Sequence, residues 1–434
     1  LEDQKRLALT LNNIGLIYTS LGNYFQALEA FQLALVIREE IKDRAGQGFT
    51  LNNIGQVYFR LGQYPKALAI YQQSLSISEE VKDLPTKGIS INNFGEIYSE
   101  IGQSLKALEF YQQALAIRRQ IGDRSGESYT LVGIGEIYSD LGEHAEALKF
   151  YQQALAINQE IGDRNGEGNI LNHIGLVYFS TGQYAKALET FQLSLEISKE
   201  ISDRQGEGAL FNNIGDVYIQ LGQYGQAAEF YRQALTILKE VGDRGGEGST
   251  LTNIGSMYNY LGEYAKALES LQQALVIRRE IGDVRGEGIT LNNIGFAYIK
   301  LGQYSKALEF LQQALALHSK VKNRMEKSTT LDNLGKAYRE LGEWSKALES
   351  FQQALFISVE IGDRSGEGKT LHQIGSLLAT QKHPEVAIVF YKQSVNVRET
   401  IRQDIRNLSR EFQESYTQSV AGTYRALADL LIAQ

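Results

Sequence analysis

Few residues in this chain have the types and spacing that catalysis or metal binding requires. None of the histidines forms an HExxH motif or another metal-ligand spacing; they are His144, His173, His318, His372 and His383. The chain has no cysteine, which excludes disulfides, thiolate catalysis and cysteine-ligated zinc within it. No Ser/His/Asp arrangement suggests a nucleophile. We therefore predict that the chain is not an enzyme and uses no cofactor or metal.

Glycine-rich segments such as residues 242–248 resemble phosphate-binding loops only superficially. They lack the Gly-Lys-Ser/Thr ending that such a loop needs, and the same pattern recurs along the chain at a fixed interval. We interpret these segments as joints between structural units.

Asparagine is the polar residue that the sequence repeats most clearly. It stands two residues before a recurrent glycine, and we call this set the asparagine ladder: Asn13, Asn53, Asn93, Asn213, Asn253, Asn293 and Asn333. Asparagine is a mediocre helix former, but its amide can donate to and accept from a peptide backbone at once. The ladder therefore predicts a peptide-binding surface. Two alternatives stay open: the amides bridge adjacent repeats, or duplication simply copied them.

Charged residues near the ladder differ between units, which is where specificity would arise. The middle units are acidic through Glu96, Glu100, Glu136, Asp140 and Asp216, and the late units are more basic through Lys300, Lys336 and Arg339. A surface of split sign would favour a ligand of matching polarity and would bind it faster. The alternative is ordinary solvated charge.

These side chains must be positioned by a structure that repeats every 40 residues. The segment LNNIG at 11–15 recurs at 51–55 and at 291–295, and the register holds from Gly15 to Gly375. Within each unit, apolar residues at helical spacing predict two amphipathic helices. A fixed period of this length predicts a solenoid, in which each unit packs on its neighbours.

Small and capping residues mark the ends and contacts of the predicted helices. Gly142 and its equivalents stand between the two helices, where a left-handed residue ends a helix well. Glycines such as Gly15 lie inside the first helix at a cost of about 1 kcal/mol each, so we expect close packing there, against small residues from Ala27 to Ala387 on the second helix. The next helix is expected to be capped by Asp43, Asp83, Asp123, Asp163, Asp203, Asp243, Asp283, Asn323 or Asp363.

The pattern of each unit resembles the tetratricopeptide (TPR) repeat. The second unit shows that signature as Ile54-Gly55, Tyr58, Gly62, Tyr64, Ala67, Tyr71 and Ser74. TPR units commonly have 34 residues, and the longer form here is similar to the repeats of Pins-type scaffolds, kinesin light chains and bacterial arrays fused to effector domains. The resemblance implies an all-α fold: a right-handed superhelical solenoid of paired antiparallel helices, with the first helices on its concave face.

Residues 4–403 are predicted to form ten tandem units, and residues 404–434 a C-terminal helix that begins an eleventh. Because that helix would lack its partner, we expect the natural protein to continue beyond Gln434. The stretch from Ile405 to Leu431, including Ser415-Tyr416 and residues 423–429, resembles the bridge between bacterial TPR arrays and a caspase-like (CHAT) protease domain. Three functions remain open: a module that binds a peptide or protein partner in its groove, the recognition or regulatory arm of such a protease or another effector, and a structural spacer.

Composition narrows the expected partners. The formal net charge of −8 and the pI near 5.4 argue against nucleic-acid binding, which needs a clustered basic stripe. The sequence contains no run of about 18 apolar residues and so predicts no membrane span. Its first residues are polar, unlike those of a signal peptide. We expect a cytoplasmic protein whose partner is a protein or peptide, with self-association through the C-terminal helix left open.

Overall fold

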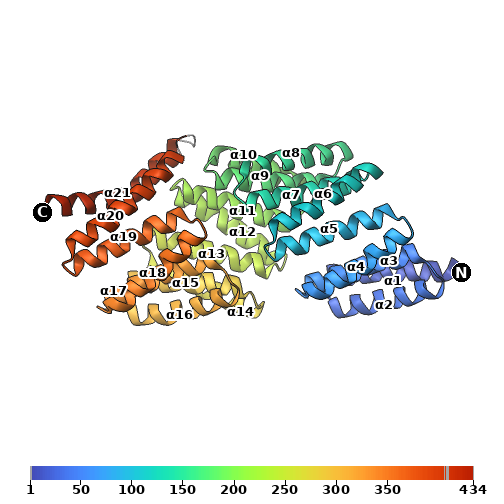
Figure 1. Ribbon diagram of the computed structural model, residues 1–434, viewed down its shortest axis with the longest axis horizontal. Helices are drawn as coiled ribbons and strands as arrows, with labels where there is room; N and C mark the ends of the chain where they lie inside the picture. The colour runs from blue at the N-terminus through green and yellow to red at the C-terminus, as the bar shows by residue number, and fades with distance from the viewer. Residues whose placement is uncertain (1, 405, 407–409, 434) are drawn as a thin grey trace. The chain divides into compact units, whose positions relative to one another are not determined.

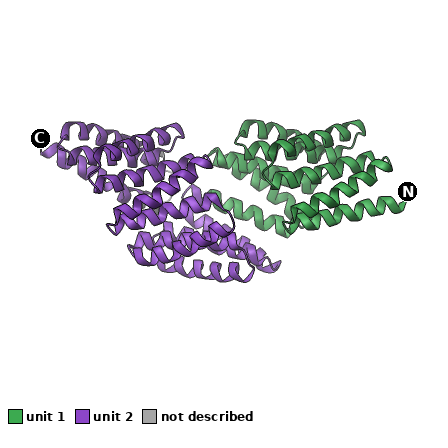
Figure 2. Cartoon of the chain, turned by 90° about the horizontal axis from the view of Figure 1, so that it is seen from below, with its two compact units in different colours: residues 1–177 green, residues 178–434 purple. Residues whose placement is uncertain are grey.

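The computed structural model describes the chain except residues 1, 405, 407–409 and 434, and every element in the described part is a helix. The helices form successive antiparallel pairs, drawn from blue to red in Figure 1. They divide into two compact units, residues 1–177 (unit 1) and residues 178–434 (unit 2), which Figure 2 colours separately. The predicted all-α array of helix pairs is thus confirmed.

The helix bounds follow the 40-residue period. Unit 1 contains α1 (Glu2–Ser20), α2 (Tyr24–Glu40), α3 (Arg44–Arg60), α4 (Tyr64–Glu80), α5 (Leu84–Glu100), α6 (Ser104–Ile121), α7 (Arg124–Asp140) and α8 (His144–Ile161). Helix α9 (Arg164–Ser180) begins in unit 1 and ends in unit 2. Unit 2 continues with α10 (Tyr184–Glu200), α11 (Arg204–Gln220), α12 (Tyr224–Glu240), α13 (Arg244–Leu261), α14 (Tyr264–Glu280), α15 (Val284–Lys300), α16 (Tyr304–Lys320), α17 (Arg324–Glu340), α18 (Trp344–Glu360), α19 (Arg364–Thr380), α20 (Pro384–Asp404) and α21 (Arg410–Ile432).

Successive odd-numbered helices approach one another within each unit. α3 contacts α5 and α5 contacts α7 in unit 1, and the same holds for α11, α13, α15, α17 and α19 in unit 2. Even-numbered helices make no comparable contact with the next even-numbered helix among the described residues. The stack is therefore tighter on the odd-numbered side, and we call the exposed surface of those helices the inner face of each unit.

The predicted caps are confirmed at the start of the odd-numbered helices. A side-chain oxygen of the capping residue accepts a hydrogen bond from the backbone N–H three residues later, at 2.8 to 3.3 Å. Such a cap satisfies one of the backbone donors that a helix start leaves unpaired. At the turn inside each pair, Gly142 and its equivalents adopt the left-handed conformation (φ 75° at Gly142), and Lys382 does so in the tenth unit (φ 62°).

At Gly15, Gly55 and their equivalents up to Gly375, as far as these contacts are described, the glycine packs against a ring or a leucine, which is not the alanine side chain that the sequence indicates. A Cβ on Gly215 would lie 2.6 Å from Cε1 of Tyr231, and one on Gly255 would lie 2.5 Å from Cγ of Leu271. The alanine four residues earlier on the second helix is fully buried, but it approaches the glycine only through its carbonyl oxygen, as Ala267 does. The missing side chain thus makes room for the largest buried group of each pair.

Helix α21 packs on α20, and the hydroxyl of Tyr416 donates to the carbonyl oxygen of Arg398 at 3.1 Å. Part of the segment that resembles a protease bridge lies outside the described residues, namely 405 and 407–409, as does the side chain of Ser415. The assignment of α21 to an eleventh unit stays a prediction.

The glycine contact makes a testable prediction about stability. We expect Gly215→Ala to destabilise the protein, because the added methyl group would press on a tyrosine ring that is itself buried; overpacking costs about 1–3 kcal/mol, against about 1 kcal/mol gained in helix propensity. The matched control is Gly225→Ala, where a Cβ would meet nothing within 4 Å. Urea unfolding followed by circular dichroism should show a lower midpoint for G215A only, and equal midpoints would contradict this account.

Candidate binding surface

Every predicted site residue lies on an odd-numbered helix. Unit 1 carries Asn13, Asn53, Asn93, Glu96 and Glu136, and unit 2 carries Asn213, Asp216, Asn253, Asn293, Lys300, Asn333, Lys336 and Arg339. Their exposure varies widely: Asn13 is exposed, whereas Asn93 and Asn333 are only 8% and 5% exposed. The set therefore follows one face in each unit, but several members offer little surface to a ligand.

The ladder amides make hydrogen bonds between adjacent repeats. Nδ2 of Asn53 donates to Oδ1 of Asn12 at 2.9 Å, and Nδ2 of Asn333 donates to Oδ1 of Asn292 at 3.0 Å. Nδ2 of Asn293 donates to the hydroxyl of Ser256 at 3.0 Å. Such bonds satisfy amides that would otherwise be buried without partners. The amides therefore have the bridging role that was one of the alternatives left open by the sequence. Ligand binding by the ladder stays a proposal.

In unit 1, carboxylates of α5 and α7 lie together on the inner face. Oε1 of Glu96 accepts hydrogen bonds from the hydroxyl of Tyr129 at 2.9 Å and from Nδ2 of Asn92 at 2.9 Å. Glu136 interacts electrostatically with Glu96 and with Asp140 at the end of its own helix. The nearest basic group to Glu136 is the imidazole of His173, with Nε2 3.6 Å from Oε1. We call Glu96, Glu100, Glu136 and Asp140 the carboxylate cluster.

The surroundings of the carboxylate cluster disfavour its negative charge. Loss of solvent raises the pKa of Glu136 to about 7, and repulsion from Asp140, Glu96 and Glu100 adds to the shift. The side chain is 49% exposed, so solvent screening reduces the effect of this shift on stability. Burial also raises the pKa of Glu96 and of Asp140. Groups with such shifts are poised to respond to an incoming positive charge.

His173 is the basic side chain beside the cluster. Burial lowers the pKa of its imidazole below the ordinary value of 6.5, which favours the uncharged ring. The ring stacks on Tyr151, with 5.4 Å between centroids and 18° between planes. This histidine therefore has a packing role within the array.

In unit 2, Asp216 forms a second, smaller acidic site. Its Oδ1 accepts from the hydroxyl of Tyr231 at 2.5 Å and from Nδ2 of the ladder residue Asn253 at 3.0 Å. Burial raises the pKa of Asp216 to about 6, although the bond from Tyr231 acts in the opposite direction. Both bonds come from within the array, as those of Glu96 do. Asp216 differs from the carboxylate cluster because no other carboxylate among the described residues is shown to act on it.

The predicted basic residues of the late units meet in one cavity. Lys300, Lys336 and Arg339 line a space of about 380 Å³ between α15 and α17. Lys336 already pairs with Asp332 (Nζ to Oδ2, 2.6 Å), and NH1 of Arg339 donates to Oε1 of Gln373 at 3.0 Å. The cavity is therefore less positive than the sequence alone suggested.

Sequence reasoning missed the residues that complete these clusters. Tyr129 on α7 holds Glu96 although it lies in the next repeat, and Asn12 accepts from the amide of Asn53 across 41 residues. The signal was present in the Asn-Asn pair that recurs in five of the ten units, because the first asparagine of one unit can accept from the second asparagine of the next. What the sequence lacked was the partner position, which only the packing of adjacent repeats defines.

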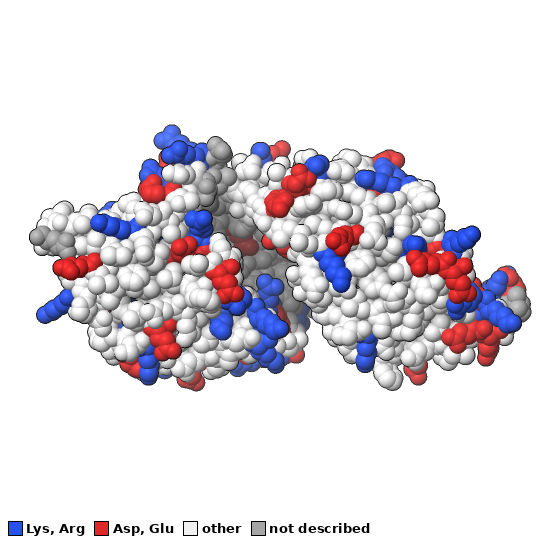
Figure 3. Space-filling view, viewed as in Figure 1, with Lys and Arg blue, Asp and Glu red and all other residues white. Residues whose placement is uncertain are grey.

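Several kinds of site are not found in the described part of the chain. It contains no cluster of three or more metal-ligating side chains, and none of its helices has the length and apolarity of a membrane span. Figure 3 shows lysine and arginine interspersed with aspartate and glutamate on the visible face.

The raised pKa of Glu136 predicts a pH dependence of stability. Its folded-state pKa of about 7 exceeds the ordinary value of 4.5, so the stability from the protonated group is fully present below about pH 4.5 and is lost as pH rises through about 7. The amide of Glu136→Gln cannot ionise. Between about pH 5 and 8, the melting temperature of this variant should therefore fall by roughly 2 °C less than that of the wild type. The difference is small because solvent exposure weakens the effect.

The matched control is Glu146→Gln on α8, where the exposed carboxylate pairs with Lys149. Thermal denaturation at both pH values should give this variant the wild-type pH dependence. Parallel curves for E136Q and the wild type would contradict the assignment of the shift to Glu136.

Comparison with known proteins gives a consistent identification of the fold. The tetratricopeptide repeat family matches residues 6–80, 50–120, 86–160, 126–200, 166–240, 207–280, 246–320, 286–358 and 326–400. No curated protein matches the chain. The match to this family does not show the predicted association with a caspase-like domain.

Solved structures with the same fold share little sequence with the chain. A signal transduction ATPase with numerous domains (STAND) protein with a TPR sensor, from Pyrococcus horikoshii, is 18% identical with a TM-score of 0.59; the match covers 85% of this chain but 55% of that one. A Rap protein complexed with competence and sporulation factor is 16% identical (TM-score 0.57), covering 83% and 99%. The apo quorum sensor NprR from B. thuringiensis is 15% identical (TM-score 0.56), also covering 83% and 99%. Together with the repeat match over residues 6–400, the helix pairs and their glycine contacts show that this chain belongs to the tetratricopeptide repeat family.

Proposed function

We propose that the chain is a protein-interaction module and that the inner face of unit 1 binds a positively charged segment of a protein or peptide partner. The observation that carries the proposal is the carboxylate cluster itself, in which acidic side chains of α5 and α7 lie close enough to repel one another. A lysine or arginine side chain placed among these carboxylates would relieve this repulsion. The favoured ligand is therefore cationic.

The energetic argument is one of linkage between protons and ligand. A cationic group that stabilises the ionised form of Glu136 lowers its pKa, and by the same coupling the ionised cluster binds the cation more tightly. Affinity should consequently increase as pH rises through about 7. The opposing basic groups, Arg118 and Arg60, act on Glu96 and do not restore its pKa to the ordinary value.

The structural neighbours support the general class of function. One of them is a Rap protein solved in complex with competence and sporulation factor, and another is a quorum sensor. Helical arrays of this kind therefore serve recognition in those proteins. Because sequence identity is below 20%, these neighbours carry nothing about the identity of the ligand here.

The asparagine ladder contributes to this proposal as the framework of the surface. Asn253 holds Asp216, and Asn53 ties α3 to α1, so the loss of either amide would disturb the packing of repeats as well as any ligand contact. Substitution of ladder residues is therefore a poor test of binding. The carboxylates at the surface give a cleaner one.

The test uses the full chain and two fluorescent octapeptides, one alternating Lys and Ala and one alternating Glu and Ala. We expect the Lys–Ala peptide to bind in fluorescence anisotropy and the double variant Glu96→Gln/Glu136→Gln to bind it at least tenfold more weakly, because each charge-assisted hydrogen bond is worth roughly 1.5–3 kcal/mol. The Glu–Ala peptide should not bind.

The matched control is Glu109→Gln/Glu146→Gln, which removes the same charge from the even-numbered helices α6 and α8. It should bind like the wild type. Equal losses in both double variants would mean that only net charge matters and would overturn the assigned surface. Absence of binding by both peptides would favour the structural spacer.

A further inference from the structure

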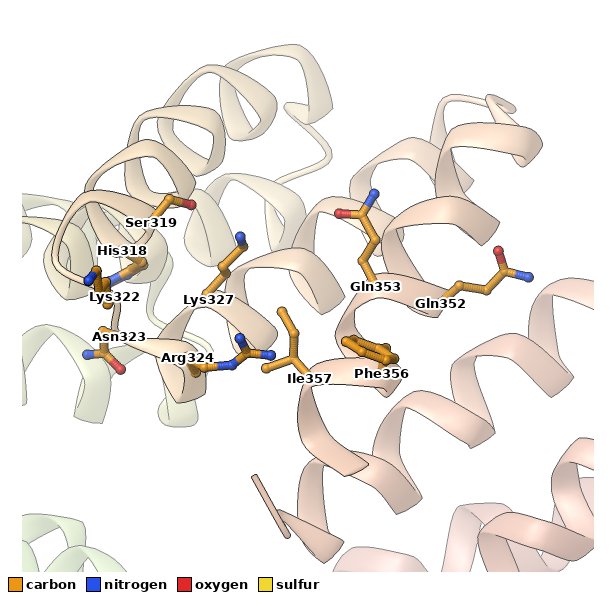
Figure 4. A pocket seen from close by; sticks show the side chains of 10 residues that line it. All are labelled: His318, Ser319, Lys322, Asn323, Arg324, Lys327, Gln352, Gln353, Phe356 and Ile357. Atoms are coloured by element: carbon orange, nitrogen blue, oxygen red, sulfur yellow. The ribbon is translucent and has the colours of Figure 1, made fainter. Parts of the chain in front are cut away.

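One cavity of unit 2 lies away from the inner face. It measures about 640 Å³ and opens between the end of α16, the start of α17 and the outer side of α18. Figure 4 shows Lys322, Arg324 and Lys327 approaching it from the α16–α17 side, and Gln353, Phe356 and Ile357 from α18. Its volume falls within the range of small-molecule sites.

The sequence around this cavity departs from the pattern of the other repeats. Where most units have a glutamate near the start of the odd-numbered helix, this one has Lys327; the equivalent residues are Glu127, Glu167, Glu207, Glu247, Glu287 and Glu367. Glu127 is almost buried and accepts from Arg119 at 2.7 Å and from Arg124 at 2.6 Å. The glutamates at positions 127, 167, 207, 247 and 287 each pair with at least one arginine.

Lys327 places a positive charge where those repeats have a negative one, and it has no acidic partner in the described part of the chain. Arg324 is paired with Glu360 instead, and the residue at the Arg119 position is Ser319. Lys87 is the other lysine at this repeat position, and it is compensated by Glu79, with 2.8 Å between Nζ and Oε1. Among the described residues, the lysine at this repeat position lacks a carboxylate partner only at Lys327, beside the cavity.

His318 stands at the end of α16, at a repeat position that holds arginine in four other units: Arg38, Arg118, Arg278 and Arg398. Arg118 donates to the carbonyl oxygen of Gly126, and Arg278 donates to the capping Asp283 at 2.6 Å. The imidazole of His318 is fully buried, and burial lowers its pKa, which favours the neutral ring. The capping residue itself is the uncharged Asn323.

The opposite wall supplies an aromatic ring and amides. Phe356 is 68% exposed, whereas the equivalent residues in the two neighbouring repeats are Ala316 and Asn396. Gln352 and Gln353 offer amide groups that can donate to an anion. The cavity thus combines two lysines without carboxylate partners, neutral donors and an exposed ring, and the described residues that line it include no aspartate or glutamate.

We propose that this cavity binds a small organic phosphate, with the phosphate between Lys322 and Lys327 and an aromatic or apolar group against Phe356. A doubly charged anion matches two lysines, and the start of a helix favours negative charge. The cavity lies on the outer side of unit 2, so a test of phosphate binding there is independent of the carboxylate cluster in unit 1.

Isothermal titration calorimetry of the full chain with phenyl phosphate tests the proposal. We expect saturable binding at or below the millimolar range, weaker binding of inorganic phosphate and none of phenol. Lys327→Gln should lower the affinity about tenfold. Phe356→Ala should reduce the affinity for phenyl phosphate to that for inorganic phosphate.

The matched control is Lys87→Gln, which removes a lysine at the same repeat position without affecting the cavity. It should bind phenyl phosphate like the wild type. Lack of saturable binding, or the same loss in K87Q and K327Q, would overturn the site. A phosphotyrosine peptide that binds more than tenfold tighter than phenyl phosphate would overturn its assignment to a small molecule.

Discussion

The close contact between a glycine and a large buried side chain inside each helix pair is the constraint on which the rest of the structure depends. Gly55 lies against the ring of Tyr71, Gly135 against that of Tyr151 and Gly335 against that of Phe351. Each glycine weakens its helix, and the loss is offset because the ring fills the space at van der Waals density. The repetition of this contact fixes how each odd-numbered helix is oriented on its partner.

That orientation determines which residues reach the inner face. Positions just before the glycine meet the preceding repeat, so their amides become bridges such as Asn53 to Asn12. Positions just after it are free to vary, and in unit 1 they accumulate carboxylates that share a poorly solvated surface. The repeats therefore differ in their surface side chains while they keep the same fold.

Local features of this structure were predictable from the sequence. The caps at Asp43 and its equivalents, the left-handed glycines and the helix pairs follow from residue types at fixed spacing. Contacts between repeats were not predictable in the same way, because they join residues about 40 positions apart whose facing surfaces depend on packing. Packing also decides the partner of the glycine within each pair, where the pattern of small residues indicates the alanine and the structure places the ring.

The same distinction applies to the two proposed sites. Glu96 and Glu136 were identified from the sequence as acidic residues of the middle units, but the bond from Tyr129 and the raised pKa required the structure. Lys327 was visible as an exception to the repeat, yet its meaning depends on the arginines and glutamates that surround the equivalent position in other units. A residue that departs from the repeat pattern can be interpreted once the contacts at the same position in the other units are known.

Direct titration of Glu136 by carboxylate-detected NMR is the measurement that tests the central claim most closely, with E136Q used to assign the signal. The account predicts a pKa of about 7 in the free protein, falling toward the ordinary value of 4.5 when the Lys–Ala octapeptide is added. A pKa near 4.5 in the free protein, or one that the peptide leaves unchanged, would contradict the view that this surface is a cation-binding site.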